Sequence, residues 1–255
     1  MILGIDYATL VWIAAASLIA FIVRGVSGFG SSMIGIGAMS IVLPPVQVVP
    51  AFLAIELLTA THLLPGVWKQ IDWRSLRWVV AGCAVTTPLG VALLGGTDAN
   101  PMRLAVSACL LLVAAFMLTS AAQRLAPRKP PGAAGAFAVG CGSGLLNGAA
   151  GIGGPPAVVF YFSAHSTAVG RATLIGFFVF TDIYSLAWAG ASGLLEGAAW
   201  KLVVVSMPFA LAGIAIGSRI YLQLDEATLR RWIWRLLFLL GSIGVISAAW
   251  RLARA

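Results

Sequence analysis

Charged residues are scarce in this sequence. Only 9% of its 255 residues are Asp, Glu, Lys or Arg, whereas 60% are hydrophobic. About a quarter of the residues in an average soluble domain are charged, so this chain cannot cover a water-exposed surface. This deficit excludes a soluble globular domain. It predicts an all-α, polytopic membrane protein, with residues 1–255 forming a single membrane domain.

Residues that carry enzymatic chemistry are equally scarce. The chain has two histidines and three cysteines, and the cysteines are scattered without metal-ligand or CxxC spacing. The patterns HExxH, GxSxG and GxxxxGK[ST] do not occur. We therefore expect no enzymatic activity, no catalytic residue, no metal site and no cofactor. Transport by such a chain would draw on a gradient rather than on ATP.

The formal net charge of +8 comes from 16 Lys and Arg against 8 Asp and Glu. Most of the cations lie in short loops between apolar runs, where they orient the spans in a lipid bilayer and do not indicate nucleic-acid binding. If the basic linker 123–132 is cytoplasmic, Arg24, Arg171 and the loops 69–77 and 219–231 also fall inside. The cations that fall outside are fewer: Arg103, Lys201, Arg251 and Arg254. The N-terminus lacks a basic region and a cleavage site and is expected to be a retained span, with both termini outside.

The apolar runs divide the chain into two similar halves, residues 8–122 and 133–252, joined by the linker 123–132. Each half holds about five helical segments, of which the second is short. Since five is odd, the halves would cross the membrane in opposite senses, as in transporters with inverted-topology repeats. Whether the short second segments span the membrane or are re-entrant is open. The expected segments are 8–23, 31–43, 46–67, 76–94 (interrupted at Pro88) and 102–122, then 133–146, 157–164, 168–195, 201–222 and 225–250.

Glycine-rich stretches interrupt both halves. Residues 24–37 read RGVSGFGSSMIGIG and residues 141–156 read CGSGLLNGAAGIGGPP. At a constant offset of about 116 residues the pair Ser27-Gly28 matches Ser143-Gly144, and Gly35 and Gly37 match Gly151 and Gly153. A lone glycine pattern usually indicates close helix packing. Dense glycines interleaved with hydroxyl and amide groups, present twice, predict broken or re-entrant helices around a substrate site.

A helix that restarts after such a break points free N–H groups and the positive end of its dipole at the cavity, which suits an anion. Arg24 is either a ligand for an oxyanion or an anchor that reaches the membrane surface. A small anionic substrate is the expected partner, and the oligomeric state is open, with a homodimer as one option. The candidate substrate-binding residues are Arg24, Ser27, Gly28, Gly30, Ser31, Gly35, Gly37, Ser143, Gly144, Asn147, Gly151, Gly153, Gly154 and Pro155.

Glu56 and Asp182 are the two acids that lie inside apolar spans, each near the middle of the third segment of its half. A charged acid at the bilayer centre costs about 2.5–3.5 kcal/mol on insertion scales, so both side chains should face the protein interior. They are candidates for gating or proton coupling. The alternative is a structural hydrogen bond between helices. His62 and His165 lie near span ends and are expected to be structural.

The glycine stretches and the two-half plan resemble the TauE/SafE family of membrane transporters. The resemblance rests on GVSGFGSSMIGIG (25–37) with the following Leu-Pro-Pro, on GLLNGAAGIGGPP (144–156) and on the basic central linker. It implies an inner-membrane, multi-pass secondary transporter that exports a small sulfur-containing oxyanion such as sulfite, sulfoacetate or a related sulfonate. The site would lie near the bilayer midplane between the two breaks. The alternative is a proton-coupled importer or a channel for another small solute.

Overall fold

The computed structural model describes residues 6–27, 30–119, 132–221 and 226–253, and these residues form helices and no strands. The helices of the first half are α1 (Tyr7–Ser27), α2 (Ser31–Ser40), α3 (Pro45–Val67), α4 (Trp73–Gly96) and α5 (Ala99–Leu118), with a 3₁₀ turn, Trp68–Gln70, after α3. Those of the second half are α7 (Ala133–Ala150), α8 (Gly154–Ala164), α9 (Thr167–Ala191), α10 (Gly197–Tyr221) and α11 (Glu226–Leu252). The linker 123–132 lies outside the described residues except for Gly132.

Six helices are long and apolar enough to cross a membrane. They are α1, α4, α5, α7, α9 and α10. Helix α3 adds a seventh span if its two parts, Pro45–Thr61 and Leu64–Gln70, count as one across a bend of 56°. Proline lacks the N–H that the helix ladder needs, so Pro65 accounts for a bend at this place. The chain is therefore a polytopic, all-helical membrane protein.

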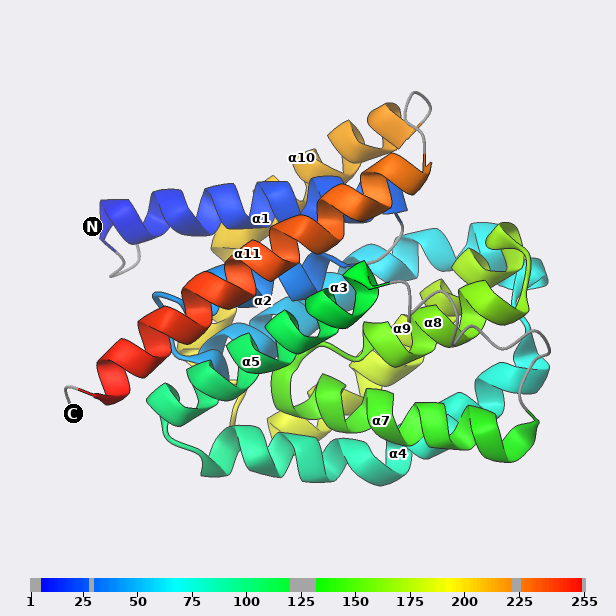
Figure 1. The fold of residues 1–255 in the computed structure, drawn as a ribbon, viewed down its shortest axis with the longest axis horizontal. Coiled ribbons are helices and arrows are strands. Elements are labelled where there is room, and N and C mark those ends of the chain that lie inside the picture. Colours follow the sequence, from blue (N-terminus) through cyan, green and yellow to red (C-terminus); the bar gives the residue numbers. More distant parts are fainter. Residues whose placement is uncertain (1–5, 28–29, 120–131, 222–225, 254–255) are drawn as a thin grey trace.

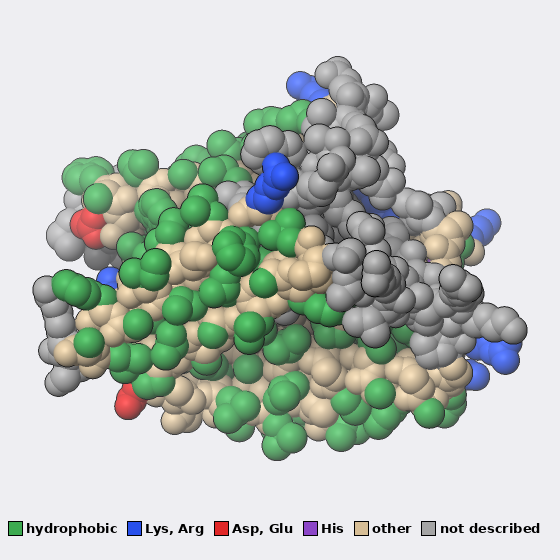
Figure 2. Space-filling view, in the orientation of Figure 1, with side chains coloured by type: hydrophobic (Ala, Val, Ile, Leu, Met, Phe, Trp, Pro, Cys, Tyr) green, Lys and Arg blue, Asp and Glu red, His purple; other side chains and the backbone are tan. Residues whose placement is uncertain are grey.

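The outer surface suits lipid. Large hydrophobic side chains stand exposed on several helices, among them Leu112 at 69%, Val204 at 63% and Ile246 at 70%. Figure 2 shows hydrophobic side chains over the middle of one face, while the acidic side chains of that face lie toward one end. Such a surface is stable against hydrocarbon and unstable against water.

Corresponding helices of the two halves have corresponding partners. Helix α1 packs along α10 at one edge of the molecule, and α7 packs along α4 at the opposite edge (Figure 1). Helices α3 and α9 contact each other between these pairs. The sense in which each half crosses the membrane, and the division into domain repeats, remain predictions.

Glycines allow these two edge pairs to come close. A Cβ on Gly144 of α7 would lie 2.6 Å from the backbone of Cys83, and one on Gly148 would lie 2.5 Å from the carbonyl of Thr87, both on α4. In the other pair, a Cβ on Gly25 would lie 2.7 Å from the carbonyl of Ile214 on α10. Only a residue without a side chain permits this backbone contact.

Both predicted breaks occur, but each is narrower than the sequence suggested. Helix α1 continues through Arg24 to Ser27, and α2 begins after Gly30, whose φ is 90°. Helix α7 continues through Asn147 to Ala150 and ends at Gly151, whose φ is 64°. The N–H of Gly151 donates to Asn147 O at 2.8 Å, as expected for a helix that ends on a left-handed glycine. Pro88, expected to interrupt its segment, lies within the continuous helix α4.

Candidate functional site

The first break brings together a cation, an acid and the start of a helix. Arg24 lies in the last turn of α1, Glu56 lies in the middle of α3, and Ser31 begins α2. Nη1 of Arg24 lies 2.6 Å from Oε1 of Glu56 and donates to Oγ of Ser31 at 3.0 Å. The Ser31 hydroxyl also donates to Oε1 of Glu56. The backbone N–H of Ser32, in the first turn of α2, donates to the same oxygen at 3.0 Å.

This cluster is closed to solvent. The side chains of Arg24 and Glu56 are each 2% exposed. Charge-assisted hydrogen bonds to a carboxylate are stronger than neutral ones, and the absence of water strengthens them further. The N-terminus of α2 adds its dipole and a free N–H, so the break forms a pocket of donors that suits an oxyanion.

Among the described residues, two polar atoms of the cluster lack a hydrogen-bond partner. They are Oε2 of Glu56 and Nε of Arg24, and both are buried. The Arg24 guanidinium thus contacts Glu56 through one nitrogen, and the described donors to Glu56 converge on one of its two oxygens.

The second break holds a similar arrangement without a cation. Asn147 lies in the last turn of α7, as Arg24 does in α1, and its Nδ2 donates to Oδ1 of Asp182 at 3.3 Å and to Oγ of Ser185 at 3.1 Å. The N–H of Gly153, just before α8, donates to Oδ1 of Asn147 at 3.3 Å. Asp182 is fully buried, and its Oδ2 has no partner. The amide of Asn147 thus takes the place that Arg24 has in the first half.

The two breaks face one another across the protein interior. Asp182 on α9 interacts electrostatically with Glu56 and with Arg24. A Cβ on Gly151 would meet side chains of Ile36 on α2 and, at 3.4 Å, Val49 on α3. One interior region therefore holds a buried cation, two buried acids and both helix breaks.

Comparison with known proteins identifies the family. Residues 13–243 match the family model described as "Sulfite exporter TauE/SafE". The chain belongs to the TauE/SafE family. It is 30% identical over 234 residues to a protein of Cupriavidus necator named "Probable sulfite/organosulfonate exporter TauE", covering 88% of this chain and 90% of that protein. No solved structure matches the chain.

Membership makes this chain a membrane transporter and not an enzyme. Its apolar helices and its family place it in the inner membrane as a multi-pass protein. The donors gathered at the first break are consistent with a transporter of anions. The individual site residues remain predictions, and the structure shows where the described ones lie.

The predicted site residues of this TauE/SafE chain separate into four groups. Arg24, Ser31, Glu56, Asn147, Asp182 and the break glycines Gly30, Gly151 and Gly153 lie at or beside the two breaks. Gly154 and Pro155 begin α8, and a Cβ on Gly154 would lie 3.3 Å from the Phe178 ring. Gly28 and the side chains of Ser27 and His62 lie outside the described residues.

Other candidates lie away from the breaks. Gly35 and Gly37 are inside α2, where a Cβ would meet the ring of Phe52 or, at 2.6 Å, the side chain of Leu110. Gly144 lies against α4, and the hydroxyl of Ser143 is buried without a partner. Close packing therefore explains why glycine occupies these positions.

The constant offset of the two glycine stretches is wrong as a structural alignment. It matches Gly35 and Gly37, inside α2, to Gly151 and Gly153, which form the break before α8. Matching by position instead pairs Arg24 with Asn147, each in the last turn before its break. The offset failed because glycines serve both helix packing and helix breaks, and a letter pattern does not separate the two uses.

Sequence reasoning did not predict that the N–H of Ser32 binds Glu56 or that Ser185 binds Asn147. Ser32 acts through its backbone N–H, which any residue at the start of α2 offers. Ser185 lies one helical turn after Asp182, and that spacing was the available signal. Thr173 was also missed; its Oγ1 accepts from the N–H of Asp72 at 2.9 Å.

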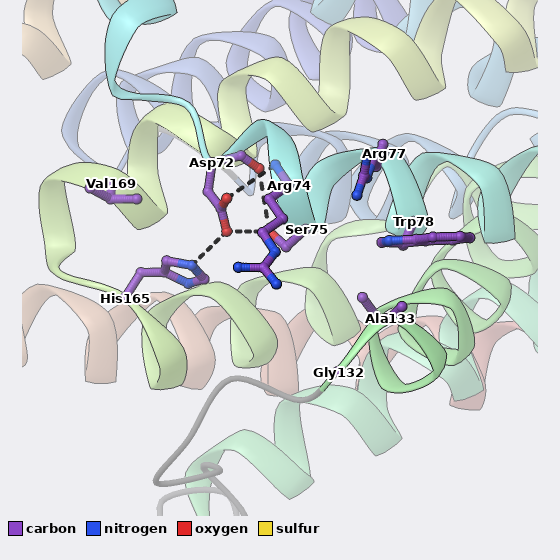
Figure 3. Close-up of a pocket in the computed structure, with 10 residues that line it drawn as sticks. Asp72, Arg74, Ser75, Arg77, Trp78, Gly132, Ala133, His165 and Val169 are labelled. Atoms are coloured by element: carbon purple, nitrogen blue, oxygen red, sulfur yellow. Dashed lines mark hydrogen bonds and ion pairs between the residues drawn. The ribbon is translucent and has the colours of Figure 1, made fainter.

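A separate cleft of about 760 Å³ opens where the start of α4 meets the starts of α7 and α9. Figure 3 shows Arg74, Ser75 and Asp72 on one side and His165 on the other. Nε2 of His165 lies 2.8 Å from Oδ2 of Asp72, so this pair links the two halves. Arg77 also lines the cleft and lies over the ring of Trp78.

Asp72 has an altered acidity. Burial tends to raise its pKa, but the hydrogen bond of Ser75 at 2.6 Å and the contact with His165 outweigh burial, so the pKa of Asp72 lies below its usual value. The carboxylate also caps α4 by accepting from the N–H of Arg74 at 3.1 Å. Arg74 and Arg77 give this cleft a positive potential that attracts anions.

Proposed function

We propose that this chain exports a small sulfur-containing oxyanion, sulfite or an organosulfonate, through a site at the first helix break. The observation that carries the proposal is the set of donors around Arg24: a buried guanidinium, the hydroxyl of Ser31 and the N–H of Ser32 converge on one position. Oxyanions are bound by such combinations of guanidinium and helix N-terminus. The name of the Cupriavidus necator relative supports the class of substrate.

The remaining residues have proposed parts in the same site. Asn147 and the second break form the opposite wall, Glu56 and Asp182 gate the site or couple it to protons, and the break glycines allow the helices to restart. Residues 8–122 and 133–252 are proposed to be inverted repeats around this site. The packing of α1 against α10 and of α7 against α4 supports this plan, because the first helix of each half contacts the fourth helix of the other half. The closed cluster requires a conformational change before the anion can enter from either side.

The membrane potential favours export. Moving one negative charge out of a negative-inside cell releases about 2.3 kcal/mol per 100 mV. Export of a monoanion therefore needs no coupled ion, whereas uptake does. The cleft with Arg74 and Arg77 lies on the side that the charge count places in the cytoplasm, and we propose it as the entrance.

Flux measurements in proteoliposomes test this function. We expect the purified protein to move sulfite, saturably, toward the positive side of an imposed potential. Arg24→Lys should lower the affinity about tenfold or more, because an ammonium cannot reproduce the planar fork of a guanidinium. Arg219→Lys, a change at an exposed arginine in the last turn of α10, is the matched control. Flux without saturation would indicate a channel, and flux that requires an inward proton gradient would indicate a coupled importer. Unchanged affinity in Arg24→Lys would exclude Arg24 as a ligand.

A further inference from the structure

We propose that the carboxylate of Glu56 occupies the position of the transported oxyanion, so that the anion binds by displacing Glu56 from Arg24. This inference rests on the proposed function, and it adds that the side chain of Glu56 competes with the substrate for the same donors. The site would alternate between Glu56 and the substrate as the group bound to the same donors. Glu56 would then determine both the affinity for the anion and its dependence on pH.

The geometry at Oε1 of Glu56 is that of a bound anion. This oxygen accepts from three donors: Nη1 of Arg24 at 2.6 Å, the hydroxyl of Ser31, and the N–H of Ser32 at 3.0 Å. None of the donors belongs to α3, the helix that carries Glu56. The donors come from the two helices that flank the break, so the pocket is complete without α3. Because Glu56 belongs to a third helix, its carboxylate can leave the pocket and another anion can take its place.

The unused atoms favour exchange over a permanent salt bridge. Among the described residues, Oε2 of Glu56 and Nε of Arg24 are buried without a partner. Because an unsatisfied buried polar atom is destabilising, this ion pair is less stable than a fully bonded one. A sulfite or sulfonate group has three oxygens and can accept from Arg24 at more than one nitrogen. It can therefore satisfy the guanidinium more fully than Glu56 does.

The second half explains why the first break, and not the second, is the anion site. There the N–H of Gly153 donates to Oδ1 of Asn147, and Asn147 is neutral. Asp182 therefore faces an amide and does not occupy a cationic pocket. Among the described residues, Arg24 therefore provides the single buried guanidinium at the two breaks, and Glu56 is the acid bound to it.

Displacement of Glu56 has a consequence for protons. The titratable or charged groups that act on this region are Arg24 from α1 and Asp182 from α9. The elements that contact α3 otherwise carry charged residues only near their ends: Lys69, Arg74, Arg77, Arg103, Arg171, Lys201 and Arg219. Once the anion holds Arg24, an ionised Glu56 would be a buried carboxylate without a cation and near a second buried acid, Asp182. Such a group takes up a proton instead. Binding of the anion should thus take up about one proton.

The test uses the full-length purified protein and ethanesulfonate, which stays singly charged between about pH 5 and pH 8. We expect wild-type affinity to rise as the pH falls, approaching about tenfold per pH unit. Glu56→Gln should bind about tenfold or more tightly than wild type at neutral pH, with little dependence on pH. Glu196→Gln, at an exposed acid before α10, is the control and should behave as wild type. Equal or weaker binding by Glu56→Gln, or a pH dependence that persists in it, would overturn the inference.

A second measurement avoids the variant altogether. Ethanesulfonate added to wild-type protein in weak buffer should raise the pH by the uptake of about one proton per anion bound. Binding without proton uptake overturns the inference but leaves the proposed function standing. If neither the wild type nor Glu56→Gln binds ethanesulfonate or sulfite at any pH, the proposed function fails, and this inference fails with it.

Discussion

Nη1 of Arg24 lies 2.6 Å from Oε1 of Glu56, which is 32 residues later in the chain. Arg24 is near the end of its helix and Glu56 is near the middle of another. An arginine that reached the membrane surface would point away from the interior, and this one points inward. The pair therefore places a cation inside the protein at the first helix break.

Arg103 should hold α2 in place. Its Nε donates to Ser40 O at 3.0 Å and to Leu43 O at 3.4 Å, where α2 ends. We expect Arg103→Ala to lower the free energy of unfolding by about 1–3 kcal/mol, because it leaves buried carbonyls without a donor. Affinity for ethanesulfonate should fall as well, because α2 carries Ser31 and Ser32. Thermal unfolding and calorimetry measure the two effects.

The control for Arg103 is Arg251→Ala. Arg251 is exposed and donates one hydrogen bond to Ile41 O at 3.4 Å. Its loss should change stability by less than about 0.5 kcal/mol. Equal effects of the two substitutions would show that Arg103 does not position α2.

Gly144 should be a packing residue of the interface between α4 and α7. A Cβ at this position would lie 2.6 Å from the backbone of Cys83. Gly144→Ala should cost about 1–3 kcal/mol of stability, because a backbone cannot move aside. At Gly142 a Cβ would meet only Pro156, at 3.9 Å, so Gly142→Ala is the matched control and should be tolerated. A stable Gly144→Ala protein that no longer binds the anion would instead place Gly144 in the binding site.

Asp72 should stabilise the protein at neutral pH but not in acid. Its pKa is lowered in the folded state, so its stabilising effect is present above the unfolded value of about 3.8 and is lost as the pH falls through the lower folded value. Asp72→Asn should therefore lower the melting temperature at pH 7, and the difference from wild type should shrink below about pH 4. Asp98→Asn is the control, because Asp98 makes no side-chain capping bond at α5. A difference that stays constant with pH would exclude this ionisation as its cause.

Asp182 should have little effect on anion binding through charge. It is fully buried and faces the Asn147 amide and not a cation, and such a carboxyl stays neutral. Asp182→Asn should therefore change the affinity for ethanesulfonate by less than about threefold, as measured by calorimetry. Ser185→Ala removes a neutral partner of Asn147 and should also leave the affinity nearly unchanged. A rise of about tenfold or more in Asp182→Asn would contradict a neutral Asp182, and an unchanged pH dependence of flux would exclude Asp182 from gating or coupling.

The all-helical membrane fold follows from composition, since a chain with so few charges has no other stable surface. The helix breaks were also foreseeable, because glycine readily takes a positive φ where a helix is interrupted, as Gly30 does before α2 and Gly151 does after α7. The internal alignment could not be foreseen. It depends on whether a glycine breaks a helix or packs against one, and that depends on the neighbouring helix. Gly144 and Gly151 lie seven residues apart on α7 and its cap, and they have these two different uses.

The sequence by itself determined the membrane class, the order of the helical segments that the structure describes, and the small set of polar residues that the apolar spans contain. These properties depend on local composition and on the cost of placing charge in hydrocarbon. Only the tertiary structure decided that Arg24 binds Glu56 while Asn147 binds Asp182, because such pairs join distant helices. It also decided that three donors converge on a single oxygen of Glu56. That convergence depends on where the break places α2, which no local pattern specifies.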